Sequence, residues 1–182
     1  MTMFADVVPT PRVWVGCLHC YNSGRLVGEW FDALGAENVT TQQVHGGRRV
    51  DPVEHEEIWV MDTDEMPVSE EMSTVDAGKW GEAIDSVPAH LRRAYYAWIA
   101  SGSIVEDGDG MPSVSDFEER YAGEWDSLSE YLQDLAIESG LLNGVDEEIA
   151  NYIDWRAYAR DRDSEYTVVD APGLKVHVFR DF

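Results

Sequence analysis

The distribution of charge along the chain constrains its fold more than any other feature. The 182 residues include 36 acids and 13 bases, which gives a formal net charge of −23. Residues 1–50 hold four acids and four bases, so the whole net charge falls on residues 51–182. The chain is nevertheless 44 % apolar and 11 % aromatic. It can therefore bury a core, and its acidity does not signal disorder.

The acidic residues are especially concentrated in residues 127–155, which contain seven carboxylates and no Lys or Arg. Like charges one turn apart destabilise a helix by about 0.2–0.5 kcal/mol per pair. A capping box of Ser127 and Glu130 and an apolar stripe still predict a helix from Ser127 to Glu138. Its outer face would carry Glu130, Asp134 and Glu138 in a line, about 6 Å apart. The stripe comprises Leu128, Tyr131, Leu132, Leu135 and Ala136.

The total charge can be compared with that of DNA. Duplex DNA carries one negative charge per about 1.7 Å of axis, so 23 charges match about 39 Å of duplex. A compact chain of this length spans about 40 Å. Direct binding to nucleic acid is disfavoured, because phosphate contacts need Lys and Arg, and a partner with a basic groove is favoured. The alternative is a solvated acidic surface, as in a salt-adapted protein, but the neutral first 50 residues argue against it.

The element pattern predicts an α+β fold with strands at both ends and helices between them. Asn22 is expected to cap a helix over residues 23–33, and residues 38–50 are expected to be loop or strand. The predicted strands cover residues 12–20, 57–62, 165–170 and 174–179, the last two as a hairpin through Ala171-Pro172-Gly173. The other predicted helices cover residues 74–86, 89–101, 113–123, 146–152 and 154–160.

Two segments have metal-like spacing. Asp107, Asp109 and Glu118 fit three positions of a calcium loop, but Met111 and Pro112 occupy positions that need an oxygen ligand and glycine. Cys17 and Cys20 have zinc-like or redox spacing, yet no second CxxC or HxxxH pair exists. We therefore expect no metal or cofactor, and interpret the cysteines as buried structural thiols.

The remaining side chains indicate no catalytic site. His19, His45, His55, His90 and His177 are scattered, and we interpret each as structural or solvated. No phosphate-binding loop or nucleophile elbow is present, and with so many acids no single carboxylate pair is informative. No apolar run reaches the roughly 18 residues of a membrane span, and no signal peptide is visible. Two cysteines suit a reducing cytoplasm.

Three segments in this order resemble the ArdA-type antirestriction proteins. They are CYNSGRLVGEWFDA (20–33), YAGEWDSLSEYLQDLAIESGLLNG (121–144) and NYIDWRAYARD (151–161). The most specific parts are Tyr21-Asn22-Ser23-Gly24 with Gly28 and Trp30, and residues 141–154, which look like the antirestriction motif of that family.

The resemblance implies an elongated multi-domain α+β homodimer without catalytic activity. Such proteins mimic bent B-DNA and occupy the DNA groove of type I restriction–modification enzymes, on the methyltransferase core with its specificity subunit. The domains would be an N-terminal α+β domain (1–72), a helical middle domain (73–112) and a C-terminal α+β domain (113–182). A second possibility is mimicry aimed at another DNA-binding host protein, from another defence system or the nucleoid.

Carried onto this chain, the resemblance assigns sixteen carboxylates to the mimic surface. The first 50 residues depart from the acidic pattern of the family because they carry no net charge. The protein therefore uses either the full length of the DNA-mimic surface or only its central part. Tyr121 and Trp125 are the predicted dimer contact. The carboxylates are Asp62, Asp64, Glu65, Glu70, Glu71, Glu118, Glu119, Glu124, Asp126, Glu130, Asp134, Glu138, Asp146, Glu147, Glu148 and Asp154.

Overall fold

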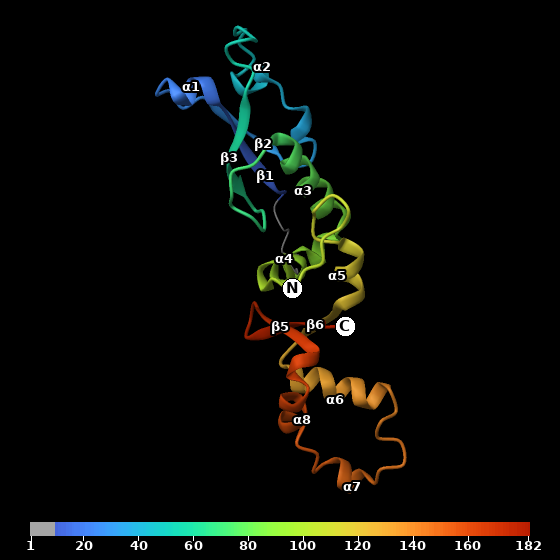
Figure 1. The fold of residues 1–182 in the computed structure, drawn as a ribbon. Coiled ribbons are helices and arrows are strands. Elements are labelled where there is room, and N and C mark those ends of the chain that lie inside the picture. Colours follow the sequence, from blue (N-terminus) through green and yellow to red (C-terminus); the bar gives the residue numbers. More distant parts are fainter. Residues whose placement is uncertain (1–9) are drawn as a thin grey trace, which may run out of the picture. The chain divides into compact units, whose positions relative to one another are not determined.

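A computed structural model describes residues 10–182, which contain helices and two three-stranded antiparallel sheets (Figure 1). The α+β class is therefore confirmed. Contacts divide the chain into two compact units: unit 1 is Met1–Tyr96 with Glu106–Val114, and unit 2 is Ala97–Val105 with Ser115–Phe182. The elongated layout and the division at residues 72 and 112 stay predictions. None of the helices within residues 10–182 is long and apolar enough to cross a membrane.

The sheet of unit 1 has the order β2-β1-β3, formed by β1 (Arg12–Cys17), β2 (Gly28–Asp32) and β3 (Ile58–Asp64). Both neighbours run antiparallel to the central strand. Val13 and Val15 of β1 are completely buried. The alternating side chains that predicted this strand therefore include the ones that face the core.

The helix predicted over residues 23–33 is wrong, because this segment contains β2. Gly24 has φ of +75°, which ends the preceding turn, and Trp14 of β1 pairs with Trp30 of β2. A Cβ on Gly28 would overlap the Trp14 ring, so this glycine permits the two strands to approach. Pairing with a strand outside the segment therefore overrides a pattern that also suited a helix.

Short helices flank this sheet. They are α1 (Leu18–Asn22), the 3₁₀ helix η1 (Ala36–Asn38) and α2 (Thr41–Val44). A capping box of Thr40 and Gln43 begins α2, which corrects the expectation of loop or strand over residues 38–50. Figure 1 shows α1 and α2 at the same end of the sheet of unit 1.

The helix α3 (Thr74–Ser86) has the predicted bounds. Its N-cap, Ser73, accepts a hydrogen bond from the Asp76 amide at 3.0 Å. The helix packs against η1 and β3. The 3₁₀ helix η2 (Ala89–Leu91) and α4 (Arg92–Ser101) follow, and the boundary between the units falls within α4.

Gly81 permits a close approach of α3 to the backbone of residues 33–34. A Cβ at this position would lie 2.6 Å from the Ala33 carbonyl oxygen and nearer still to the Leu34 amide nitrogen. We expect Gly81→Ala to lower the free energy of unfolding by about 1–3 kcal/mol, because main-chain atoms cannot move aside cheaply. Urea denaturation measures the change. Gly108→Ala is the control, since a Cβ there meets nothing within 4 Å; a stability equal to wild type in Gly81→Ala would contradict the close contact.

The sheet of unit 2 has the order β4-β6-β5, formed by β4 (Tyr121–Trp125), β5 (Tyr166–Ala171) and β6 (Lys175–Arg180). The predicted C-terminal hairpin is confirmed as β5 and β6. The predicted helix over residues 113–123 ends earlier, as α5 (Val114–Arg120). Strand β4 was missed because it is short and irregular: Gly123 has φ of +112°, and the register with β6 shifts beside it.

Further helices complete unit 2. They are α6 (Leu128–Glu138), α7 (Glu147–Ala150), α8 (Trp155–Asp161) and the 3₁₀ helix η3 (Asp163–Glu165). Helices α6 and α8 lie side by side in Figure 1, and Tyr131, Leu132, Ala159 and Val178 form the buried cluster between helices and sheet. All three predicted helices of this region are therefore present, although α7 ends two residues earlier than predicted and α8 lies one residue later.

Candidate functional site

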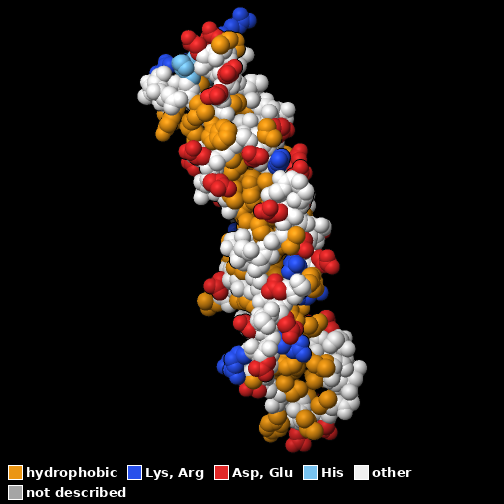
Figure 2. Space-filling model, in the orientation of Figure 1, with side chains coloured by type: hydrophobic (Ala, Val, Ile, Leu, Met, Phe, Trp, Pro, Cys, Tyr) orange, Lys and Arg blue, Asp and Glu red, His pale blue; other side chains and the backbone are white. Residues whose placement is uncertain are grey.

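The sixteen carboxylates assigned from sequence, here called the acidic surface, are all exposed to solvent. Five belong to unit 1 and eleven to unit 2. On the face shown in Figure 2, acidic side chains lie on both units as separate spots, with uncharged and apolar surface between them. A protein that met the acidic surface would therefore encounter discrete anions on a folded scaffold.

In unit 1 the acidic surface follows the end of β3. Asp62 and Asp64 are exposed strand residues paired with Trp14 and Arg12 of β1. Glu65 has φ of +54°, and its carbonyl oxygen accepts a hydrogen bond from the Tyr96 hydroxyl at 2.9 Å. This contact anchors the turn that follows β3.

In unit 2 the clearest part of the acidic surface is the outer face of α6. Tyr131, Leu132 and Ala136 are buried, whereas Glu130, Asp134 and Glu138 are exposed. The apolar stripe is narrower than predicted, since Leu135 is 37 % exposed. The packed face holds the helix in place, and the opposite face presents carboxylates one turn apart.

Most members of the acidic surface have no cation beside them. Within residues 10–182, one of the sixteen forms an ion pair: Glu124 Oε1 lies 3.4 Å from Lys175 Nζ. Other bases pair with acids outside the set, as Arg92 does with Asp85 and Arg120 with Asp116. Internal pairing therefore leaves most of the acidic surface available to a partner.

Three members also stabilise the ends of helices. The Asp146 side chain accepts a hydrogen bond from the Glu148 amide at 2.9 Å, and Asp154 accepts one from the Ala157 amide at 3.0 Å. Glu130 Oε2 accepts from the Asp126 amide at 2.8 Å. Substitutions at these three positions would alter helix termini as well as charge.

The two residues predicted as a dimer contact pack largely inside unit 2. The Tyr121 ring stacks on Phe117 with centroids 5.5 Å apart, and burial raises the pKa of its hydroxyl to about 12. Trp125 Nε1 donates to the Ala122 carbonyl at 2.9 Å. Their dimer role stays a prediction. More exposed apolar side chains lie at Ile137, Leu141, Val145, Ile149 and Tyr152, the last 84 % exposed.

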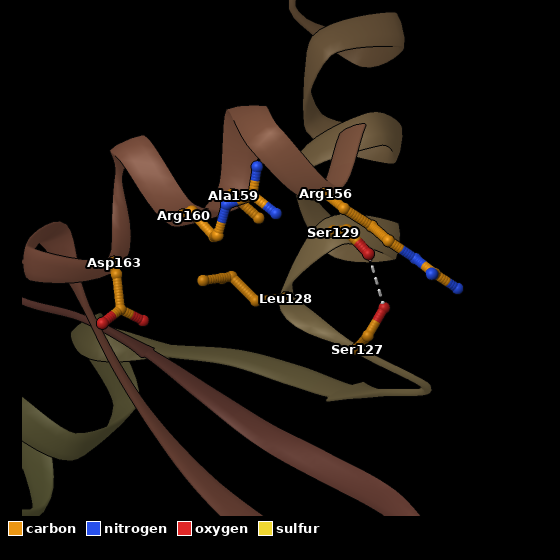
Figure 3. A pocket seen from close by; sticks show the side chains of 7 residues that line it. All are labelled: Ser127, Leu128, Ser129, Arg156, Ala159, Arg160 and Asp163. Atoms are coloured by element: carbon orange, nitrogen blue, oxygen red, sulfur yellow. Dashed lines mark hydrogen bonds between the residues drawn. The ribbon is translucent and has the colours of Figure 1, made fainter. Parts of the chain in front are cut away.

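Figure 3 shows a hollow of about 540 Å³ between the first turn of α6 and α8. Arg156 and Arg160 line it, but their side chains point in different directions, and Asp163 lies beyond Arg160. Ser127 Oγ and Ser129 Oγ form a hydrogen bond with each other at 2.9 Å. The hollow thus lacks the convergent polar groups of an enzyme site.

The cysteines are in a different setting from the one expected. Cys17 and Cys20 are buried, as predicted, but His45 and His55 lie beside them, and the four ligand atoms are all within 4.8 Å of one another. Sequence reasoning missed this group because the histidines come from two separate segments.

The calcium-like loop over residues 107–118 is not among the ligand clusters found within residues 10–182. Its Asp107 instead accepts hydrogen bonds from the Asp109 and Met111 amides.

Burial raises the pKa of the Cys20 thiol, and its hydrogen bond with Cys17 adds to this shift. Desolvation lowers the pKa of His55, with contributions from His19 and His45. Desolvation also lowers the pKa of His177, whose Nδ1 is 3.2 Å from the Tyr121 hydroxyl. These shifts favour the neutral forms of the three groups.

In a comparison with protein families, the family model described as antirestriction protein (ArdA) matches residues 13–173. The chain belongs to the ArdA family. The resemblance inferred from three segments is thereby confirmed over most of the chain. All sixteen carboxylates of the acidic surface lie within the part that matches the ArdA model, as do Cys17, Cys20, His45 and His55. No curated protein matches the chain.

In this ArdA protein, the segment that resembles the antirestriction motif connects α6 to α8 through α7. Residues 141–154 contain four members of the acidic surface and the exposed side chains of Leu141, Ile149 and Tyr152. The segment thus combines anions with apolar side chains at the surface of unit 2.

Proposed function

We propose that this ArdA-family protein is an antirestriction inhibitor that mimics DNA and occupies the DNA-binding groove of type I restriction–modification enzymes. The observation that carries the proposal is the acidic surface, whose sixteen members are all exposed and of which one has an ion pair with another described residue. By inhibiting these enzymes in the cytoplasm of a bacterial host, the protein protects incoming DNA from a phage or mobile element.

The proposed mechanism is competition for a cationic groove. Lys and Arg of a DNA-binding protein gain affinity by displacing counterions from phosphates, and a fixed array of carboxylates offers the same gain. Because buried residues hold α6 in place, little ordering is needed on binding. The repulsion among neighbouring carboxylates is relieved when the basic groove arrives. No reaction of the protein itself is involved.

We further propose that the protein acts as a homodimer. Ile137, Leu141, Val145, Ile149 and Tyr152 expose apolar surface within one region of unit 2, which favours burial against a second copy. Two copies carry about 46 negative charges, which match roughly 78 Å of duplex. Such a length suits an enzyme that holds DNA along an extended groove.

The direct test is displacement of DNA. A labelled duplex with the recognition site is bound to a type I methyltransferase core with its specificity subunit, and the purified protein is titrated in at low salt. Fluorescence anisotropy is expected to fall to the value of free duplex near stoichiometric addition. The logarithm of the apparent binding constant is expected to fall linearly with the logarithm of the salt concentration, because counterion release drives binding.

Duplex that stays bound at low salt, with the protein in molar excess, would reject the type I enzyme as the target. The second candidate, another DNA-binding host protein, rests on the same acidic surface. A pull-down from host lysate with the tagged protein distinguishes the two, because it identifies whether a restriction enzyme or another DNA-binding protein is captured.

A further inference from the structure

Unit 1 contains a group of four metal-ligand side chains that DNA mimicry does not use. Cys17 ends β1, Cys20 lies in α1, His45 follows α2, and His55 precedes β3. The cysteines are 0 % and 2 % exposed, and the histidines are half-buried. Their Sγ and ring nitrogen atoms all lie within 4.8 Å of one another. Strand β1, helix α1 and two connecting segments therefore bring two sulfurs and two nitrogens close together.

The distances fit a tetrahedral metal site. Cys17 Sγ is 3.3 Å from His55 Nδ1, and Cys20 Sγ is 3.6 Å from both His45 Nε2 and His55 Nδ1. In a tetrahedral zinc site, bonds of about 2.3 Å to sulfur and 2.0–2.1 Å to nitrogen separate these atoms by about 3.6 Å. The side chains are therefore already spaced as ligands around a common centre.

Neighbouring groups orient two of the ligands. His45 Nδ1 lies 2.7 Å from the Thr41 carbonyl oxygen, so it carries the proton and leaves the lone pair of Nε2 directed toward Cys20. Metal-binding histidines commonly have such a partner on the second nitrogen. Arg25 Nη2 donates to Cys20 Sγ at 3.8 Å, so a cationic side chain lies beside this sulfur.

The local fold gives such a site a structural purpose. Helix α1 has five residues and α2 has four, and helices this short are unstable unless other contacts hold them. The segment from His45 to His55 has little regular structure. A bound ion would join α1, α2 and this segment to the end of β1, where few buried apolar side chains are available.

From this geometry we propose that Cys17, Cys20, His45 and His55 bind one Zn²⁺ per chain and that this ion stabilises unit 1. Two thiolates and two imidazoles in tetrahedral arrangement select zinc among the common divalent ions. Four protein ligands leave no open position for a substrate, so the site is structural rather than catalytic. The proposal does not depend on the function of the acidic surface.

A second ligand cluster provides a matched control. His19, Glu54 and His55 also lie within 4.8 Å of one another, but they include no thiol and only three ligands. If zinc binds as proposed, His19→Ala keeps the metal and His45→Ala loses it. The opposite result would place the ion in the second cluster and overturn the proposal.

The experiment uses the full chain purified under reducing conditions without chelator. Elemental analysis is expected to give about one zinc per wild-type and His19→Ala chain, and less than about one tenth of that for His45→Ala and the double variant Cys17→Ser/Cys20→Ser. Cobalt substitution of the wild type is expected to give the thiolate charge-transfer absorption of a tetrahedral site. Removal of zinc with a chelator is expected to lower the melting temperature, and added Zn²⁺ to restore it.

A measurement on the wild type keeps the test valid if the variants fail to fold. Cys17 and Cys20 are the two cysteines of the chain, so a thiol reagent reports on this site alone. Zinc is expected to slow their modification at least about tenfold, and chelator to abolish this protection. Equal reactivity with and without zinc, a melting temperature unaffected by chelator, or a Cys17–Cys20 disulfide in the freshly purified protein would each reject the site.

Discussion

Replacing Asp134 and Glu138 together by lysine is expected to raise the protein concentration needed for half-inhibition of a type I enzyme at least about tenfold, or about 1.4 kcal/mol. Both side chains are exposed on α6 and within residues 10–182 form no ion pair. Lysine there would face cations in the groove, and like charges across an interface are strongly unfavourable. The measurement is displacement of labelled duplex, with circular dichroism to verify folding.

These two positions are preferable to Glu130, which accepts a hydrogen bond from the Asp126 amide. Position 138 lies in the last turn of α6, so the lysine that replaces Glu138 interacts favourably with the helix dipole. The matched control is Asp161→Lys with Asp170→Lys, which changes the net charge equally at exposed positions of unit 2 outside the acidic surface. Equal losses in both double variants would show that inhibition depends on total charge rather than on this face.

The largest loss of stability is expected from Phe117→Ala, at about 3–5 kcal/mol. Phe117 is fully buried in unit 2, and its ring lies 5.9 Å from Trp98, 5.5 Å from Tyr121 and 6.2 Å from Phe179, measured between centroids. Truncation removes these aromatic contacts and leaves a cavity. Since whole domains have about 5–15 kcal/mol of stability, inhibition should fall with the folded fraction.

Thermal and urea unfolding followed by tryptophan fluorescence measure this effect. Phe117→Leu is the graded comparison, because it keeps most of the buried volume and should lose less stability. If Phe117→Ala unfolded at the same urea concentration as wild type, Phe117 and its aromatic neighbours would not contribute the stability that their burial implies.

Much of the helical structure could be predicted from sequence because its signals are local. Ser73 and Ser127 cap α3 and α6, and the apolar spacing that follows identifies the buried face of each helix. The hairpin of β5 and β6 was predictable in the same way, from alternation around Ala171-Pro172-Gly173. The exposure of the acidic surface could also be predicted from the sequence, since charged side chains are rarely buried without partners.

The errors came from contacts between distant segments. Residues 23–33 suited a helix, but cross-strand pairing of Trp14 with Trp30 makes part of the segment a strand. The ligand group of Cys17, Cys20, His45 and His55 could not be recognised from spacing, because the fold rather than the sequence brings the histidines together. CxxC remains the signal that could have prompted a search for more distant ligands.

The absence of bases that leaves α6 and α7 without internal counterions also affects how the protein can be dissected. No Lys or Arg occurs between Arg120 and Arg156, so trypsin has no cleavage site across β4, α6 or α7. This stretch would emerge from complete digestion as one long peptide. Amine-directed cross-linkers would likewise find nothing to react with there. Mapping of a complex should therefore rely on glutamate-specific proteolysis and carboxyl-directed reagents.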